Sequence, residues 1–505
     1  MARIKANVGL TALRSRLDAG LALLIGLIAF LLTTGGRILN PKYTDWLLGE
    51  QDPPTFFLGW HFFRNSPMLQ LPLGANPDYG MEIGSSIVFS DSIPLLALIL
   101  QPFSGVLPET FQYIGLWVML CFALQALFAY RLLGRFTPHK SLMLVGSAFF
   151  ALAPVLLWRL YGHYALCGQW VILAALYFYF APGGRYGRWL ALLCIAALIH
   201  AYLLIMVGAV WGSDLVQRML RREVSLYGIA IRFATGAVAV AAVMWLAGYF
   251  MVGNDGVRGI ADVLYRMNLL SPIDPEKIWS RLLPNQPQTD GDYEGFAYPG
   301  IGMLMLGLWA FYEFVRKPKG TMDFKALAPL FALGACLCIY AASNHVAIGE
   351  HELFAYTLPP FAERIAGIFR ATGRLFWPVY YMIYLAIFYV VFTRVRQRAA
   401  LLMCAGLLCV QIADSTVAFD FFRNKFNNPK PVLSLQSPLW NAFPGQYKHV
   451  VYVLPYNLAK HYVPLAYFAA SNRMTINVGY FARVDLRKQE AARQQVASAI
   501  LSNRL

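Results

Sequence analysis

Residues 49–65, GEQDPPTFFLGWHFFRN, combine acidic and basic side chains with a dense group of aromatic ones. A carboxylate held rigidly beside an aromatic wall has the properties that a general base requires. Asp52 is the best candidate, because Pro53 and Pro54 after it end any preceding helix and favour the start of a new one. Asp52 also fits the N-cap of a helix over residues 55–65, and the two roles are compatible.

Other carboxylates compete with Asp52 for the role of base. Asp45 and Glu50 lie close to it in the sequence. Asp91 lies further along, in FSDSIP, where an aspartate before Ser-Ile-Pro is typical of a helix start. We predict that Asp91 caps a short helix rather than acting in catalysis.

Two motifs place arginines at the ends of apolar segments. Arg159 and His163 are four residues apart in LWRLYGHYALCGQ and would share one face of a helix. Arg370 and Arg374 have the same spacing in FRATGRLFWP. Arginine matches phosphate oxygens in a bidentate geometry, so these motifs are candidates to hold a phosphate group. Anchoring of helix ends at a membrane interface is the alternative for both.

His200 and Tyr202 lie at the predicted apex of a short hairpin between two apolar segments. An ionisable residue in such a position is a functional candidate by default. A histidine whose ring is satisfied by a backbone carbonyl is the alternative. A further acidic motif, Asp290-Gly291-Asp292, lies in a polar segment, but turns favour Asp-Gly, and no metal is assigned.

The composition indicates a mainly helical protein that crosses a membrane many times. The chain has 505 residues, of which 58% are hydrophobic and 13% charged, whereas a soluble domain carries roughly 25% charge. A crossing helix needs about 20 mostly apolar residues, and about eleven segments qualify. They are 18–36, 112–133, 141–158, 166–181, 188–200, 201–217, 229–250, 299–316, 326–343, 375–394 and 399–417. The shorter apolar stretch 92–106 predicts a helix lying in the membrane interface.

Basic residues predict which loops stay in the cytoplasm, because Lys and Arg are retained there. With the N-terminus placed inside, every short connection assigned to the cytoplasm is basic. The residues concerned are Arg131, Arg135, Lys140, Arg185, Arg188, Arg218, Arg221, Arg222, Arg316, Lys317, Lys319, Lys325, Arg394, Arg396 and Arg398. This bias and contact with anionic lipids explain the net charge of +16, so binding to nucleic acid is not expected.

The same alternation predicts that the polar segments face outwards. The long outer segments are 37–111, 251–298, 344–374 and 418–505. We therefore predict a membrane domain over residues 1–417 and a small extracytoplasmic α/β domain over 418–505. In the second domain, 447–454 reads as a strand and 485–503 as a helix.

The order of these features resembles the GT-C superfamily of membrane glycosyltransferases. That pattern has one helix, a large first outer loop with interfacial helices and an acidic residue, a second helix that ends in basic residues, and a third that ends at a polar outer motif. More narrowly, most of 37–400 resembles the bacterial DUF6311 family. The matching stretches are FFLGWHFFRN, LPLGANPDYG, SSIVFSDSIPLLAL, LPETFQYIGLWVMLCFALQALFAYRLL, LWRLYGHYALCGQWVIL and FRATGRLFWP.

The GT-C resemblance implies an inverting glycosyltransferase in the bacterial inner membrane. It would move a sugar from a polyprenyl-phosphate carrier to a glycan, lipid or protein acceptor in the periplasm. The superfamily's first-loop carboxylate corresponds to Asp52, or less well to Asp45. The implied ligands of the donor phosphate are Arg370, Arg374, Arg159 and His163. The implied substrate-binding residues are His61, Trp60, Arg64, His200 and Tyr202.

The first loop departs from the superfamily in having no clean Asp-Glu or Asp-x-Asp pair, so Asp45 remains a competitor of Asp52 and a divalent metal remains unassigned. A transporter or flippase of lipid-linked glycans is one alternative, although transporters often contain internal repeats and none is visible here. A polymerase or ligase of such glycans is a second, and it would use outer arginines without needing a carboxylate. A scaffold that binds a partner is a third.

Overall fold

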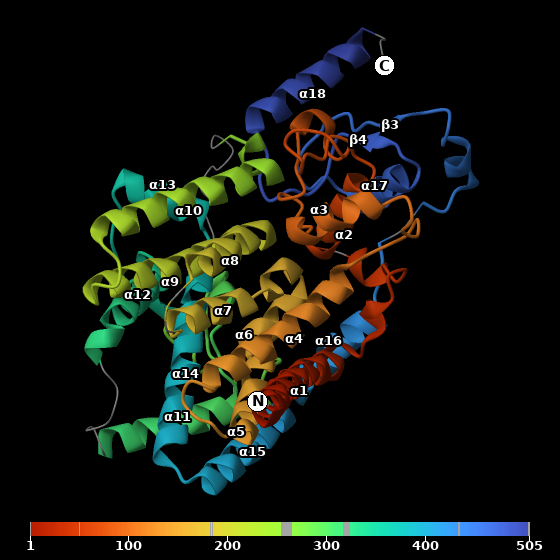
Figure 1. The fold of residues 1–505 in the computed structure, drawn as a ribbon. Coiled ribbons are helices and arrows are strands. Elements are labelled where there is room, and N and C mark those ends of the chain that lie inside the picture. The colour runs from red at the N-terminus through yellow and green to blue at the C-terminus, as the bar shows by residue number, and fades with distance from the viewer. Residues whose placement is uncertain are drawn as a thin grey trace.

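The computed structural model describes residues 2–49, 51–181, 183, 185–253, 265–316, 324–432 and 435–502. In these residues the chain is mainly helical, with two small two-stranded sheets (Figure 1). Glu50, Lys317 and Lys319, which carried sequence predictions, lie outside the described residues.

The helices and strands follow one another along the chain, with short 3-10 turns between some of them. The helices are α1 (Ala2–Thr34), α2 (Pro53–Phe63), α3 (Pro94–Leu100), α4 (Ile114–Leu133), α5 (Lys140–Ala151), α6 (Pro154–Leu157), α7 (Trp170–Tyr179), α8 (Tyr186–Ile199), α9 (Ala201–Leu220), α10 (Leu226–Ala247), α11 (Ile301–Arg316), α12 (Phe324–Ala342), α13 (Pro360–Ile368), α14 (Trp377–Arg394), α15 (Gln397–Asp414), α16 (Thr416–Asn427), α17 (Tyr462–Ser471) and α18 (Leu486–Leu501). The strands are β1 (His345–Ile348), β2 (His351–Ala355), β3 (His449–Val450) and β4 (Thr475–Ile476).

Seven helical segments of the described chain are long and apolar enough to cross a membrane. They are Leu17–Thr34, Ile114–Leu133, Lys140–Tyr161, Ala201–Leu220, Leu226–Ala247, Thr372–Arg394 and Gln397–Asp414. Each coincides with one of the predicted spans, because a long apolar run is a local property of the sequence. The chain is therefore a multi-pass membrane protein.

The other four predicted spans are also helical, but they differ in length. Three contain shorter apolar helices, Tyr164–Tyr179, Tyr186–Ile199 and Leu327–Ala342, and the fourth is α11, with 16 residues. The predicted hinge at His200 is present, since its backbone is extended (φ −167°, ψ 141°) and separates α8 from α9. Of the about eleven predicted spans, seven are thus helices of full length within the described residues, and the other four are shorter.

Close backbone contact joins the first two spanning helices. A Cβ atom on Gly26 of α1 would lie 2.3 Å from the carbonyl oxygen of Phe122 in α4, so only glycine allows this approach. Small residues at helix interfaces have this role in membranes. Asp18 and Lys140 pair at 2.5 Å and bring the start of the first span to the start of α5.

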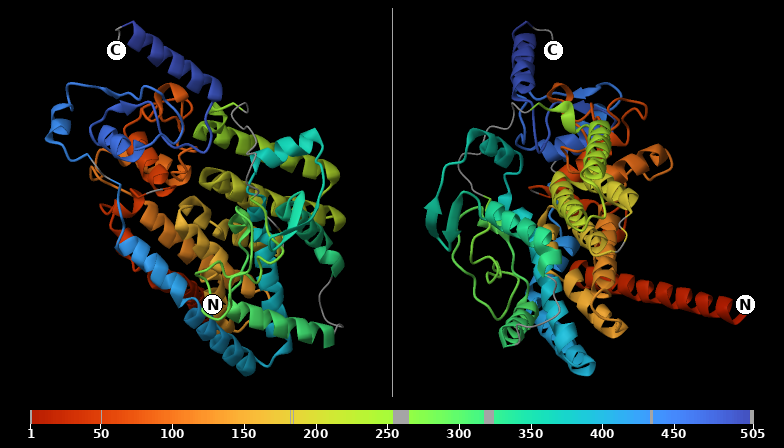
Figure 2. Two further views of the ribbon diagram at one scale, coloured as in Figure 1. Left: turned by 180° about the vertical axis from the view of Figure 1, so that it is seen from behind. Right: turned by 60° about the vertical axis from the view of Figure 1, so that its left-hand side comes forward.

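The C-terminal region is joined to the first outer segment by backbone hydrogen bonds. The backbone N–H of Gly80 donates to the carbonyl of Ile476 at 2.8 Å, and the N–H of Ile476 donates to that of Asp78 at 3.0 Å. The N–H of Ala482 donates to the carbonyl of Phe89 at 2.8 Å. Figures 1 and 2 accordingly show α2, α3 and α17 grouped together, with α18 beyond them.

The small C-terminal region is mixed α/β, as the sequence predicts, but its strands are short. β3 pairs in parallel with β4 and covers only two residues of the predicted strand 447–454, whereas α18 closely matches the predicted helix 485–503. The helix α16, at the start of the predicted domain 418–505, packs along α1 (Figure 1). Its Arg423 donates to the carbonyl of Leu32 at 2.7 Å.

Candidate functional site

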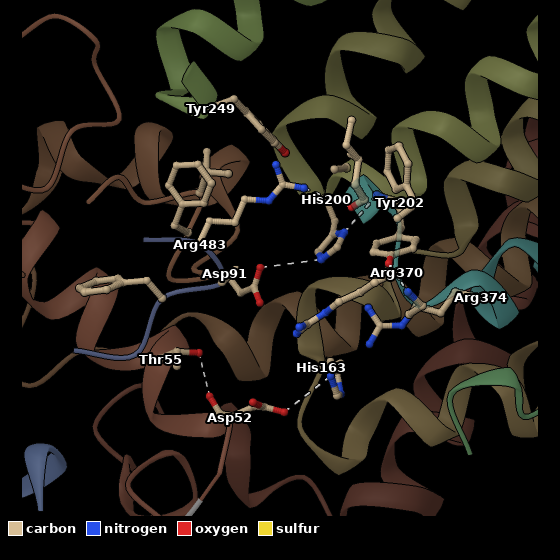
Figure 3. Close-up of a pocket in the computed structure, with 18 of the residues that line it drawn as sticks. Asp52, Thr55, Asp91, His163, His200, Tyr202, Tyr249, Arg370, Arg374 and Arg483 are labelled. Atoms are coloured by element: carbon tan, nitrogen blue, oxygen red, sulfur yellow. Dashed lines mark hydrogen bonds and ion pairs between the residues drawn. The ribbon is translucent and has the colours of Figure 1, made fainter. Parts of the chain in front are cut away.

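A cavity of about 590 Å³, lined by both ionisable and apolar side chains, lies where the first outer segment, the α8–α9 junction, the turn before α14 and the C-terminal region meet. The ionisable carboxylates, histidines and arginines that line it come from distant parts of the sequence. They are Asp52, Asp91, His163, His200, Glu294, Arg370, Arg374 and Arg483. Figure 3 shows the labelled members of this group around one common space.

Asp52 occupies the predicted N-cap position of α2, but its side chain does not cap the helix. Its backbone carbonyl instead accepts hydrogen bonds from the N–H and the hydroxyl of Thr55, at 3.0 and 2.8 Å. The carboxylate faces the cavity, with Oδ2 3.6 Å from Nε2 of His163 (Figure 3). Burial raises the pKa of Asp52, although a hydrogen bond with the Tyr480 hydroxyl and the charge of Arg374 lower it. Asp52 is thus a carboxylate with increased basicity.

The prediction that Asp91 caps a helix is wrong. The helix α3 begins at Pro94, its N-cap position is Ile93, and no side chain of the described residues caps it. Asp91 has a φ of +51°, in the left-handed region where Asp and Asn are enriched. Its carboxylate lines the cavity, with Oδ1 3.8 Å from Nε2 of His200 (Figure 3).

Replacement of Asp91 by Asn is expected to change how stability depends on pH. Burial and, to a smaller extent, the charge of Asp52 raise the pKa of Asp91 to about 7, against the lowering effect of Arg374. Since this value exceeds the ordinary pKa of about 3.9, the folded state binds the proton more tightly than the unfolded chain does. The stability that this proton contributes is full below about pH 3.9 and is lost as the pH rises through 7.

The Asp91→Asn variant lacks this titration, and Asn tolerates the positive φ. The melting temperature of the variant, relative to that of wild type, should therefore rise between about pH 5 and about pH 8. Thermal unfolding of both proteins in one detergent, at both pH values, measures this difference in melting temperature. A difference that stays constant with pH would contradict the assignment of this ionisation to Asp91.

The two cavity histidines are neutral near pH 7, since burial lowers the pKa of each to about 3. Nδ1 of His200 accepts a hydrogen bond from the backbone N–H of Tyr202 at 3.2 Å. Its ring proton therefore lies on Nε2, the atom that faces Asp91. Each histidine thus presents an uncharged ring to a carboxylate, His163 to Asp52 and His200 to Asp91.

Glu294 is the buried counter-charge of two arginines and lies in the 3-10 turn Asp292–Gly295. Arg374 binds both of its oxygens, from Nε to Oε2 at 2.8 Å and from Nη2 to Oε1 at 2.6 Å. Arg159 donates from Nη1 to Oε2 at 2.9 Å, and its guanidinium lies over the ring of Trp377. Burial raises the pKa of Glu294, but the charges of Arg374 and Arg159 outweigh it and hold that pKa well below its usual range.

Two facing glycines permit this ion-pair arrangement. Gly295 follows Glu294, and Gly373 precedes Arg374. A Cβ atom on Gly373 would lie 2.5 Å from the Cα atom of Gly295, closer than real Cβ contacts. The two backbones can approach this closely because residue 373 has no side chain, whereas a Cβ atom on Gly295 would meet the carbonyl oxygen of Arg266 at 2.3 Å.

The segment before α14 carries the second predicted arginine, Arg370. The Tyr202 hydroxyl accepts a hydrogen bond from the backbone N–H of Ala371 at 2.8 Å. Nη2 of Arg483 donates to the carbonyl of Ile368 at 3.1 Å. Arg370 lies between these two supports, with its guanidinium 5.7 Å from the ring centroid of Tyr265. Asp52, His163, His200, Tyr202, Arg370 and Arg374 are thus brought to one cavity.

Asp45 and Arg159, both predicted as site residues, do not line this cavity. Asp45 is exposed in the turn Asp45–Leu47 and is not among the residues that line the cavity. Arg159 is almost fully buried, behind Glu294. The structure therefore separates Asp45 from Asp52 as a candidate base and gives Arg159 an indirect place at the site.

The predicted substrate residues Trp60, His61 and Arg64 do not line the cavity either. A helix rises about 1.5 Å per residue, which places His61 about 13 Å along α2 from Asp52. All three side chains bind neighbouring structure. Arg64 donates to the carbonyls of Ser104, Pro108 and Glu109, Trp60 donates to that of Phe111, and Nε2 of His61 contacts the Ser471 hydroxyl.

Sequence reasoning missed the place of Glu294, Arg483 and Asp91 in the cavity lining. Glu294 had a usable signal, because two buried arginines at a membrane boundary require a carboxylate and Glu294 precedes an apolar span. Arg483 lies in a short segment, GYFARVD, that shows no local sign of contact with distant loops. Within the described residues, no group of three or more His, Cys, Asp or Glu side chains is arranged to hold a metal ion.

The fold and the site define a helical multi-pass membrane protein with a cavity, lined by ionisable and apolar side chains, that a C-terminal region helps to enclose. A family model described as "Domain of unknown function (DUF6311)" matches residues 23–416. A second model, "DUF6311 C-terminal domain", matches residues 439–505. The chain belongs to the DUF6311 family.

Among solved structures, the chain is similar to the archaeal oligosaccharyltransferase AglB from Archaeoglobus fulgidus, in complex with an inhibitory peptide and a dolichol-phosphate. The similarity covers 96% of this chain and 68% of that chain, at 11% sequence identity and a TM-score of 0.36. At this level the likeness assigns no function. The comparison with curated proteins finds no match.

Proposed function

We propose that this protein is an inverting glycosyltransferase of the GT-C type. It would move a sugar from a polyprenyl-phosphate-linked donor to an acceptor on the outer side of the membrane. The observation that carries the proposal is that Asp52 lines the same cavity as Arg370 and Arg374. A base for the acceptor and cations for the departing phosphate are the two parts that this reaction needs.

In the proposed reaction, the acceptor hydroxyl gives its proton to the Asp52 carboxylate while its oxygen attacks the anomeric carbon of the sugar. The bond between that carbon and the phosphate oxygen breaks on the opposite face, so the configuration inverts. The bonding electron pair leaves with the polyprenyl phosphate. Arg370 and Arg374 stabilise the negative charge that collects on the phosphate.

Electrostatic features of the cavity support these roles. The raised pKa of Asp52 makes it a stronger base than an aspartate in water. His163 lies 3.6 Å from that carboxylate and is uncharged, so it adds no positive charge that would lower the pKa of Asp52. Glu294 holds Arg374 in place through two hydrogen bonds, so this cation needs no rearrangement when charge develops.

The apolar part of the cavity lining suits a lipid-linked substrate. Met244, Phe250 and Phe369 line the cavity beside its polar groups. Met244 lies near the end of α10, a candidate spanning helix in which only Gly236 and Ala247 are buried, so that much of its apolar surface is available to lipid. A polyprenyl chain could lie along this surface while its phosphate reaches the arginines.

The proposal is tested with the protein purified in detergent. Lipids that co-purify with it are expected to include a polyprenyl-phosphate-linked sugar, identified by mass spectrometry. Incubation of that lipid with candidate acceptors should release polyprenyl phosphate and form a product of inverted anomeric configuration, read by NMR. Movement of an intact lipid-linked glycan across vesicles without bond cleavage would overturn the proposal in favour of a flippase.

A further inference from the structure

The two adjacent N–H donors of Arg374 that are best placed to bind a phosphate already bind a carboxylate of the protein. Its Nε and Nη2, the adjacent donors that would match two phosphate oxygens, both bind Glu294. Arg159 binds the same carboxylate and does not line the cavity. These two arginines therefore stabilise the site mainly through Glu294, and other cations have a greater capacity to bind an anion.

Arg370 and Arg483 are the cavity arginines that form no ion pair with any carboxylate of the described residues. Arg483 uses Nη2 on the carbonyl of Ile368, which leaves the remaining guanidinium donors for another partner. Burial lowers the pKa of Arg483, and the nearby charge of Arg370 lowers it too. Neither guanidinium is paired with a carboxylate of the described residues, so both can donate to an anion that enters the cavity.

Backbone and side-chain contacts hold Arg483 at the cavity. The N–H of Ala482 donates to the carbonyl of Phe89 at 2.8 Å. The amide of Asn457 binds Phe481 twice, accepting from its N–H at 2.9 Å and donating to its carbonyl at 2.9 Å. Figure 3 shows the Arg483 side chain reaching from this segment into the space that also contains Asp91 and Arg370.

We propose that Arg483 and Arg370 together bind the phosphate group of a lipid-linked donor, so that the C-terminal region completes the binding site. The inference rests on the proposed function, because it names the ligands of that reaction's leaving group. The chemistry recognised is a phosphate or diphosphate anion that accepts hydrogen bonds from two guanidinium groups. Arg374, fixed by Glu294, then adds charge from one side.

The test compares dissociation constants for undecaprenyl phosphate, undecaprenol, inorganic phosphate and pyrophosphate, by microscale thermophoresis in one detergent. Arg483→Gln and Arg370→Gln are each expected to weaken binding of undecaprenyl phosphate by about 10- to 100-fold, the effect of losing a hydrogen bond to a charged group. Arg483→Lys keeps the positive charge but loses the planar pair of guanidinium donors. Its dissociation constant for undecaprenyl phosphate should therefore lie between those of wild type and Arg483→Gln. This second variant decides the result if Arg483→Gln lowers the melting temperature.

Arg493→Gln is the matched control. Arg493 belongs to the same C-terminal region and donates from Nε to the carbonyl of Pro455 at 3.0 Å, but it does not line the cavity. Its replacement should leave all four dissociation constants unchanged.

The outcomes separate this inference from the proposed function. If wild type prefers undecaprenyl phosphate to undecaprenol but both Arg483 variants bind it like wild type, the role of Arg483 is overturned and the proposed function stands. If wild type binds both lipids equally, both proposals are overturned. If inorganic phosphate binds as tightly as the lipid phosphate, the lipid-linked ligand is overturned.

Discussion

Replacement of Asp52 by Asn is expected to slow sugar transfer by about 10²- to 10⁴-fold, the usual contribution of a positioned base. Affinity for the donor should change little, because the variant keeps the cavity arginines and the shape of the side chain. Folding should also be preserved, since the helix start uses the backbone carbonyl of residue 52 rather than its carboxylate. Single-turnover rates at saturating donor, with donor binding measured separately, give both quantities.

Asp45→Asn is the informative companion, because Asp45 lies in the same loop but is exposed outside the cavity. It should transfer sugar at the wild-type rate. Loss of transfer in Asp45→Asn with normal transfer in Asp52→Asn would reverse the assignment of the base. Normal transfer in both variants would favour a lipid-linked glycan polymerase or ligase that works with arginines and no carboxylate.

Replacement of Glu294 by Gln is expected to have the largest effect on stability. It leaves Arg159 and Arg374 buried without a carboxylate, and breaking a buried pair in this way costs about 3–5 kcal/mol. The free energy of unfolding should therefore fall by that order, seen as a lower melting temperature and a smaller yield of monodisperse protein. Removal of one arginine as well, in Glu294→Gln with Arg159→Met, should restore part of the loss.

The control for the Glu294→Gln variant is the same substitution at a glutamate whose ion pair is exposed to solvent. Glu490 lies 3.8 Å from Arg493 on the surface of α18, and such pairs contribute about 0–1 kcal/mol. The melting temperature of Glu490→Gln should be close to that of wild type. Equal melting temperatures for the two Glu→Gln variants would mean that Glu294 is not the counter-charge of a buried arginine pair.

Features that depend on local sequence could be predicted. The span Ile114–Leu133 follows from an apolar run of sufficient length, and the helix start near Pro53 follows from proline chemistry. The chemical types of Asp52, Arg370 and Arg374 also marked them as candidates. Their meeting in one cavity was inferred from membrane sidedness alone, which restricts polar groups to one side without fixing distances.

Features that depend on tertiary packing could not be predicted in the same way. Asp91 lies in a sequence typical of a helix start, but its backbone is in the left-handed region and Ile93 occupies the N-cap position of α3 instead. Trp60 and Arg64 are close to Asp52 in sequence, but α2 carries them out of the cavity and into packing contacts. Arg483 reaches the site only through pairing between two segments that are remote along the chain.

That remote pairing affects how the protein is made. The Tyr480 N–H that bonds to the hydroxyl of Tyr79 emerges from the ribosome 401 residues after its partner. At roughly 5–20 residues per second, the earlier segment waits on the order of 20–80 s for it. During this interval the nascent chain lacks the C-terminal residues that line one side of its cavity, so a product of interrupted translation would have an incomplete cavity.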